Sequence, residues 1–90
     1  MEFTEITQNY PLGLLLSAED DVKKIEKMLN KGRGVAAREN GDIVGAYILR
    51  EPRNSHTAEI SIIVVAENAR GKGVARLLLQ DAEGRAKQDG

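Results

Sequence analysis

The sequence predicts a mixed α/β fold, a mainly antiparallel sheet of four strands in sequential order with flanking helices. Asn40 and Gly41 lie between two apolar segments, and both tolerate the positive φ that a type I′ hairpin turn requires. Segments 18–31 and 73–88 carry apolar side chains at helical spacing. Segment 57–65 alternates its side chains as a strand does. We expect residues 1–90 to form a single small domain.

The N-terminal part is expected to contain a strand, a helical turn and a helix. Residues 3–7 alternate in polarity, which indicates a short half-buried strand. The apolar segment 11–16 is interpreted as a helical turn. Ser17 resembles a helix N-cap with Asp20 at the third helical position, and Gly32 closes that helix. Its apolar stripe comprises Val22, Ile25, Met28 and Leu29. We expect its lysines to form a solvated face rather than a docking patch: Lys23, Lys24, Lys27 and Lys31.

The remaining segments are expected to add a hairpin, a further strand and a final helix. The hairpin strands are 35–39 and 43–50, and the second is apolar at nearly every position, as suits a central strand covered on both faces. In segment 57–65 the alternation places these side chains on one face: Glu59, Ser61, Ile63 and Val65. The last helix begins near Gly73, and its buried stripe comprises Val74, Leu77, Leu78 and Ala82.

Composition and charge exclude several classes of function. The chain has 13 basic and 14 acidic side chains and a formal net charge of −1, which argues against non-specific binding of nucleic acid or of anionic membranes. It has no cysteine, and His56 is a lone histidine in a polar loop, so we expect no disulfide and no metal site. The N-terminus is acidic and polar, unlike a signal peptide, and the longest apolar run, 62–66, is too short to span a bilayer. We expect a soluble, cytoplasmic protein.

The segment ENARGKGVARLLL, residues 67–79, has the composition of an anion site at the start of a helix. The first helical turn leaves backbone N–H groups unpaired, and the helix dipole adds positive charge there. Gly71 and Gly73 lack the Cβ atoms that would hold a bulky anion away from those amides. Positive side chains nearby are Arg70, Lys72 and Arg76. The spacing matches neither a P-loop nor the G-x-G-x-x-G motif of dinucleotide folds. A flexible turn before a helix is the alternative interpretation.

The run R-G-K-G-V-A, residues 70–75, resembles the R/Q-x-x-G-x-G/A motif of the acetyl-CoA pyrophosphate loop in the GNAT superfamily of N-acyltransferases. Its position after a strand and at the start of a helix is also similar to that family. The segments VAARENGDIVGAYIL and AEISIIVV resemble the family too, so the resemblance covers essentially the whole chain. It implies part of the acyl-CoA N-acyltransferase fold and transfer of an acetyl group from acetyl-CoA to a primary amine, without a metal.

The resemblance also implies roles for individual residues. The pyrophosphate would be received by the loop residues Arg70, Gly71, Lys72, Gly73, Val74 and Ala75. The main chain of Ile63 and Val65 would pair with the pantetheine arm like an added strand, and the substrate amine would attack the thioester directly. Glu59 is the catalytic candidate, because the family often places a general-base carboxylate on this strand. The alternative is that Glu59 only solvates the exposed start of a strand.

The sequence departs from the family pattern at Glu67 and Ala69, where the family commonly has a proline and an aromatic residue. The family also continues with elements that build the other wall of the cleft and provide a tyrosine for the departing thiolate, a position that neither Tyr10 nor Tyr47 matches. Two functions therefore stay open: an N-acetyltransferase whose acetyl-CoA half is this chain, and an inactive module for CoA binding or protein association. The amine acceptor is not identified. We expect a homodimer through the exposed edge of strand 57–65.

Overall fold

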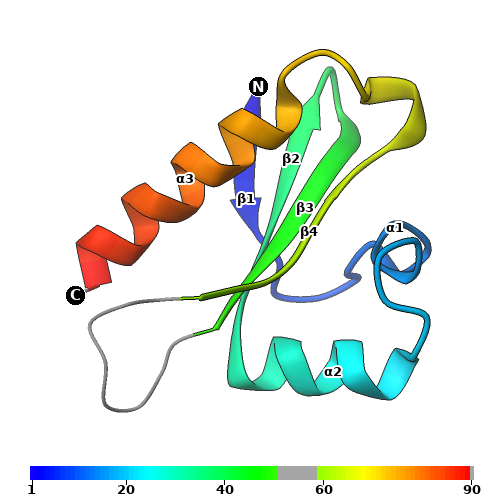
Figure 1. The fold of residues 1–90 in the computed structure, drawn as a ribbon, viewed down its shortest axis with the longest axis vertical. Coiled ribbons are helices and arrows are strands. Elements are labelled where there is room, and N and C mark those ends of the chain that lie inside the picture. The colour runs from blue at the N-terminus through cyan, green and yellow to red at the C-terminus, as the bar shows by residue number, and fades with distance from the viewer. Residues whose placement is uncertain (51–58, 90) are drawn as a thin grey trace.

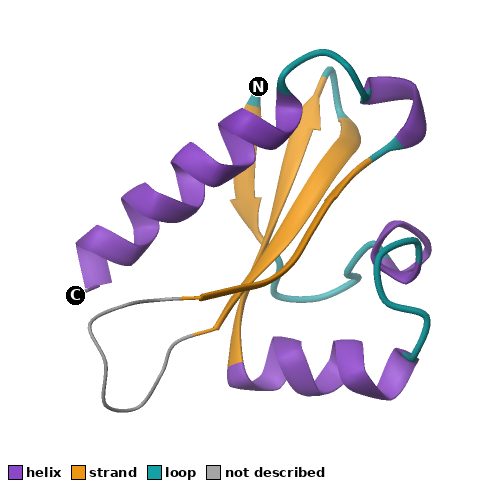
Figure 2. Cartoon of the chain, in the orientation of Figure 1, coloured by secondary structure: helices purple, strands orange, loops and turns teal. Residues whose placement is uncertain are grey.

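The computed structural model describes residues 1–50 and 59–89, with only the backbone at 88 and 89. Its sheet has the strand order β1-β2-β3-β4, and each strand is antiparallel to its neighbour (Figures 1 and 2). The fold class predicted from the sequence is confirmed. The elements in chain order are β1 (Glu2–Glu5), α1 (Leu12–Leu16), α2 (Val22–Lys31), β2 (Gly32–Glu39), β3 (Asp42–Arg50), β4 (Glu59–Val65), the 3-10 turn η1 (Glu67–Ala69) and α3 (Val74–Asp89).

The turn between β2 and β3 has the conformation that its two residues predict. Asn40 has φ 53° and Gly41 has φ 87°, so both lie in the left-handed region that a type I′ turn needs. Glu39 and Asp42 close the hairpin as opposed partners. This turn sets the register of the strand ends beside it, and a register shift between Ala37 and Arg38 changes the pairing further along the two strands.

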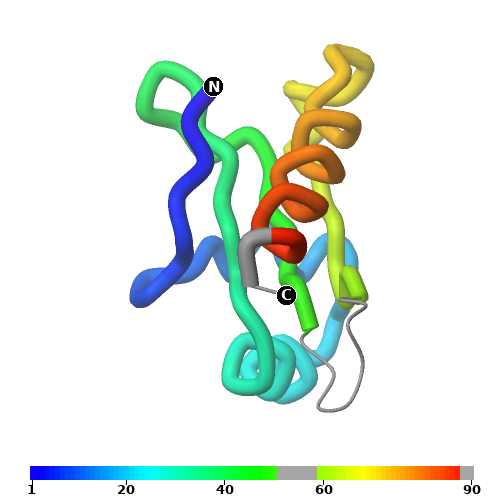
Figure 3. Tube along the Cα trace, turned by 90° about the vertical axis from the view of Figure 1, so that its left-hand side faces the viewer, coloured from blue at the N-terminus to red at the C-terminus, as the bar shows by residue number. Residues whose placement is uncertain are grey.

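The sheet is covered on both faces. On one face α3 packs over β3 and β4, and the buried residues there are Val35, Ala37, Tyr47, Leu49, Ala69, Val74, Leu78 and Ala82. On the other face α1 packs over β3 and β4 and α2 over β2 and β3, with Leu15, Ile25, Ala46, Ile48, Ile62 and Val64 buried. Figure 1 shows α3 on one side of the strands and the two shorter helices on the other, and Figure 3 shows β1 and β4 at opposite edges. The apolar β3 is thus central, as expected.

The helix predicted for 18–31 begins later, at Val22, and its N-cap is Asp21 rather than Ser17. Asp21 Oδ1 accepts a 3.0 Å hydrogen bond from the backbone N–H of Lys23. Ser17 instead ends α1, where its hydroxyl donates to the Leu14 carbonyl at 2.6 Å. Ser and Asp are both common helix N-cap residues. Because Ser17 lies at the C-terminal end of α1, the N-cap of α2 is the later residue, Asp21.

A β-bulge interrupts β4, so its side chains do not alternate along the whole strand as the sequence predicts. Ile62 lies opposite Ile48 and Ile60 lies opposite Leu49, so Ser61 is an extra residue without an opposed partner. An extra residue in one strand moves the side chains beyond it to the other face. Of the predicted range 57–65, residues 57 and 58 lie outside the described residues, as does His56.

The bulge separates residues that an uninterrupted alternation places together. Ile63 lies opposite Tyr47 and therefore on the α3 face, whereas Glu59 lies opposite Arg50, on the face that α2 covers. The prediction that Glu59 and Ile63 share one face is therefore wrong.

Two smaller expectations also need correction. Leu77, predicted in the buried stripe of α3, is 38% exposed. The buried face of α3 consists of Val74, Leu78 and Ala82, and Leu77 is rotated by about 100° from Leu78, so it lies at the margin of that face. The first strand covers Glu2–Glu5 rather than 3–7, although the N–H of Ile6 still donates to the Gly34 carbonyl at 2.7 Å. In the described part of the chain no helix is both long and apolar enough to cross a membrane.

Candidate functional site

The segment between β4 and α3 is a loop built on left-handed glycines. After η1, the backbone of Arg70 is extended, with φ −69° and ψ 150°. Gly71 has φ 80° and Gly73 has φ 79°, a region that residues with a Cβ rarely adopt. The helix α3 begins directly afterwards, at Val74. The two glycines are therefore required by the backbone of the loop itself.

Backbone N–H groups at this helix start are available to a ligand. The first helical amide with a partner is that of Leu77, which donates to the Gly73 carbonyl at 3.3 Å. Within the described residues, the N–H groups of 71–76 have no backbone acceptor. A Cβ built at Gly71 or Gly73 would meet no atom within 4 Å, so the space beside the loop is open. With the dipole of α3, these amides form a favourable place for an anion.

The side chain of Arg70 turns back onto β4. Its Nε donates to the Val65 carbonyl at 3.3 Å, and this contact ties the loop to the last residue of the strand. The Arg70 residue as a whole stays exposed, as do Lys72 and Arg76. The structure therefore brings all three predicted cations to the loop, with one of them also holding the loop against the strand end.

The free edge of β4 leads directly to this loop. Among the described strands, β4 pairs only with β3. The N–H of Ala66 donates to the Val44 carbonyl at 2.8 Å, and in an antiparallel pair the hydrogen-bonded positions recur at every second residue. Ile63 and Val65 are the alternate positions, so their N–H and C=O groups point away from β3. The main chain of Ile63 and the N–H of Val65 are open to an extended partner, whereas the Val65 carbonyl already accepts from Arg70 Nε.

A cavity of about 360 Å³ lies beside the loop, between α1 and the end of β4. Its wall on the strand side includes Val65 and Arg70, and its wall on the helix side includes Leu14 and Ser17. The cavity and the open strand edge thus meet at the same place, where Arg70 contacts Val65.

The catalytic candidate Glu59 lies far from the loop. It is exposed and stands at the start of β4, six residues before Val65, which is about 20 Å of strand. Glu59 and the glycine loop are therefore at opposite ends of one strand, and only a long extended molecule could touch both.

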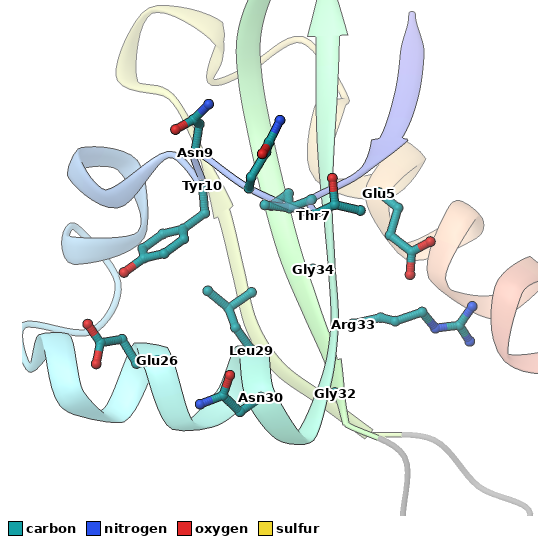
Figure 4. A pocket seen from close by; sticks show the side chains of 12 residues that line it. Glu5, Thr7, Asn9, Tyr10, Glu26, Leu29, Asn30, Gly32, Arg33 and Gly34 are labelled. Atoms are coloured by element: carbon teal, nitrogen blue, oxygen red, sulfur yellow. The ribbon is translucent and has the colours of Figure 1, made fainter.

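Another cavity, of about 450 Å³, contains none of the predicted site residues. It lies between the connection from β1 to α1 and the C-terminal half of α2. Figure 4 shows the side chains of Tyr10, Glu26 and Leu29 on the helix side of this cavity, and those of Glu5 and Arg33 across the strand from them.

Sequence reasoning missed two polar features of the structure. Tyr47 is fully buried and its hydroxyl donates to Asp81 at 2.6 Å, and burial followed by this contact raises the pKa of Tyr47 above its usual value. Arg50 and Ser61 line a third cavity together with lysines of α2. Both features join residues from different elements, so no local sequence pattern predicts them. In the described ranges no three His, Cys, Asp or Glu residues gather as a metal site.

The chain matches a known protein family. The family model described as "Acetyltransferase (GNAT) family" matches residues 2–90. An IAA acetyltransferase from Bacillus cereus ATCC 14579 is 34% identical with a TM-score of 0.91, and the match covers 99% of this chain and 59% of that one. A GNAT family acetyltransferase from Elizabethkingia anophelis, with acetyl-CoA bound, is 32% identical with a TM-score of 0.84, over 96% of this chain and 58% of that one.

A third solved structure, the Bacillus subtilis acetyltransferase in complex with CoA, is 31% identical with a TM-score of 0.84, over 97% of this chain and 57% of that one. No match was found among curated proteins. The chain thus spans just under three fifths of the length of each of these three relatives. The family match extends over nearly all of its residues, and the chain belongs to the GNAT family of acetyltransferases.

Proposed function

We propose that this chain forms the acetyl-CoA-binding part of an N-acetyltransferase that transfers an acetyl group from acetyl-CoA to a primary amine. The observation that carries the proposal is the continuity of two open backbone surfaces. The unpaired amides of the loop between Gly71 and α3 adjoin a strand whose free edge is formed by Ile63 and Val65. Two relatives at 31–32% identity were solved with acetyl-CoA or CoA bound.

In this proposal the two surfaces hold different parts of one ligand. The pyrophosphate accepts hydrogen bonds from the amides of residues 71–75, with Lys72 and Arg76 adding charge. The pantetheine arm carries amide groups, and these pair with the main chain of Ile63 and Val65 as an added strand would. The thioester then lies further along β4, toward its N-terminal half.

The reaction proceeds by direct attack in this scheme. The amine nitrogen attacks the thioester carbonyl carbon, the C–S bond breaks, and CoA leaves as a thiolate that takes a proton. The proton lost by the amine passes to Glu59, directly or through one water. Glu59 and Ile63 are separated by four residues of strand, about 13 Å, which leaves room for the thioester and the amine between them.

Calorimetry followed by a thiol-release assay tests this function. Acetyl-CoA is expected to bind with one-to-one stoichiometry, and amide resonances of residues 71–75 are expected to shift. Because the phosphates carry the contact with the loop, pantetheine without its nucleotide should bind much more weakly. Absence of acetyl-CoA binding at high protein concentration would exclude the proposal.

An inactive module is the second candidate, and the exposure of β4 favours it. Ile60 and Ile63 are each 36% exposed beside an unpaired strand edge, which is the kind of surface that associates with another chain. The two candidates differ in one measurement. A module binds acetyl-CoA without thiol release in the presence of amines, whereas a transferase releases CoA.

A further inference from the structure

The face of the sheet that α2 covers contains a cavity of about 280 Å³ with a strongly cationic wall. It lies between α2 and the region where β3 ends and β4 begins. Its lining residues are Lys24, Lys27, Met28, Lys31, Arg50 and Ser61. Among the described residues that line it, four carry a positive charge and none is acidic, although the chain as a whole has a formal net charge of −1.

Within residues 1–50 and 59–89 the four cations have no directly bonded acidic partner, since none of them makes an ion pair or hydrogen bond with an acidic side chain there. Lys24, Lys27 and Lys31 recur at spacings of three and four, so they project from one side of α2, where like charges repel one another and destabilise the helix. Lys31, in the last turn, gains from the helix dipole, but Lys24 is in the first turn and does not. An anion in the cavity would relieve this repulsion.

The bulge of β4 brings the proposed reaction centre to this same face. Ser61, the extra residue, lines the cavity with its hydroxyl free of any partner in the described chain. Glu59 lies opposite Arg50 on the neighbouring strand, so the candidate base borders the cationic cavity. The Arg50 guanidinium is a planar fork that matches the two oxygens of a carboxylate or phosphate. The Glu59 carboxylate attracts the opposite kind of group, an ammonium.

We propose that this cavity binds the anionic group of the acceptor, so that the substrate is an amine that also carries a carboxylate or phosphate. The inference rests on the proposed acetyl transfer and names its substrate class. The anion sits among Lys24, Lys27 and Arg50, and the amine end lies toward Glu59 and the thioester. A small open hollow bordered by a few cations suits a small anion better than a nucleic acid, which needs an extended positive stripe.

Titrations with three small amines followed by amide resonances test the proposal. O-phosphoethanolamine and β-alanine are expected to shift the resonances of Lys27, Arg50 and Ser61, whereas ethanolamine, which lacks the anion, is expected to leave them in place. Comparison of O-phosphoethanolamine with β-alanine shows whether the cavity prefers a phosphate or a carboxylate. Equal shifts with all three amines, or none with any, would overturn the proposal.

Variants with a matched control locate the site. The double variant Lys27→Gln with Arg50→Gln should weaken binding of the preferred anionic amine by at least about tenfold, because two charge-assisted contacts are lost. Lys23→Gln removes one charge from the same helix outside the cavity and should bind as the parent does. Lys27→Gln should also leave the urea midpoint unchanged or raise it, which a purely structural lysine would not do. Equal weakening by Lys23→Gln would indicate general attraction and overturn the assignment.

Failure of the acceptor-site proposal can be distinguished from failure of the proposed acetyl-CoA function. Acetyl-CoA shifts at residues 71–75 without any response of the cavity to anionic amines would overturn the acceptor assignment and leave acetyl-CoA binding intact. Failure of acetyl-CoA to bind would exclude the proposed transferase function, and with it the role of the cavity as an acceptor site.

Discussion

Tyr47 on β3 and Asp81 on α3 are joined by a 2.6 Å hydrogen bond from the phenol hydroxyl to Asp81 Oδ2, although 34 residues separate them in sequence. Arg85 Nε donates to the same oxygen at 2.7 Å, and Arg85 Nη2 donates to the Phe3 carbonyl at 3.3 Å. This chain of contacts links α3 to a central strand and to the edge strand β1. It fixes the rotation of α3, and hence the direction in which its N-terminus and the glycine loop face.

Removal of the Tyr47 hydroxyl should destabilise the protein. Tyr47→Phe keeps the ring in the core but removes the bond to a charged acceptor, so the free energy of unfolding should fall by about 1–2 kcal/mol. Urea denaturation measures this loss. Tyr10→Phe is the control, because the described residues give the Tyr10 hydroxyl no hydrogen-bond partner, so the change should be within about 0.5 kcal/mol. Equal effects of the two substitutions would contradict the role of the Tyr47–Asp81 contact.

Stability should also fall at alkaline pH through Tyr47. Burial, and then the contact with Asp81, raises the pKa of this phenol above its ordinary value of 10.0. Above pH 10 the unfolded chain loses the phenol proton while the folded chain keeps it, so unfolding is favoured as the pH rises. The slope from one such group is about 1.4 kcal/mol per pH unit. Urea midpoints of the parent and of Tyr47→Phe, compared between pH 9 and 11, should converge; a constant difference would count against this.

Features encoded within a few residues were predictable from the sequence. Asn40 and Gly41 specify their turn through their own backbone preferences, and Gly71 and Gly73 do the same for the loop. Their positive φ angles are needed whatever packs around them. The hairpin and the start of α3 are therefore where the sequence-based fold agrees best with the structure.

Features that depend on distant partners were not predictable. The bulge at Ser61 arises from register with β3, and an alternating pattern alone gives no sign of an extra residue. The same bulge moves Glu59 to the other face. The cationic cavity joins Lys24 to Arg50 across two elements, so the lysines could be interpreted only as a solvated helix face. The roles of Glu59 and of the loop residues stay predictions.

Substitution of Gly73 should weaken acetyl-CoA binding. Gly73→Val forces a β-branched residue to adopt φ 79° and adds bulk beside the amides, so we expect more than about tenfold weaker binding and about 1–2 kcal/mol lower stability. Gly84→Ala is the control, since Gly84 lies inside α3 and its Cβ would meet nothing within 4 Å. It should raise stability by about 0.5–1 kcal/mol and leave binding unchanged. Calorimetry on folded samples decides; parent-like binding by Gly73→Val would refute the loop assignment.

Acetyl transfer by these 90 residues alone should be weak or absent. In the described part β4 has no second neighbour, so water reaches the strand edge where the thioester would lie. Tyr47 lies opposite Ile63, but it is buried with its hydroxyl bonded to Asp81, so it is not placed to protonate the thiolate. General-acid help of this kind is worth about 10²–10⁴ in rate. We expect thiol release close to the uncatalysed rate. Rapid release that Glu59→Gln abolishes, and that Glu83→Gln on α3 does not, would contradict this expectation and make Glu59 the catalytic base.

Association should cover the open edge of β4. Ile63 lies on that strand with 36% of its surface exposed, and its main-chain groups point away from β3, so a second copy can pair there and bury both. Because the pantetheine arm would occupy the same edge, we expect a homodimer in light scattering at micromolar concentration in the absence of acetyl-CoA, and a monomer after Ile63→Lys. Ile62→Lys would be a poor test, because Ile62 is buried beneath α2 and its substitution would disturb folding. Val22→Lys is the matched control: Val22 is 37% exposed but lies at the start of α2, and this variant should remain dimeric. A parent chain that is already monomeric would show that this edge does not associate with a second copy.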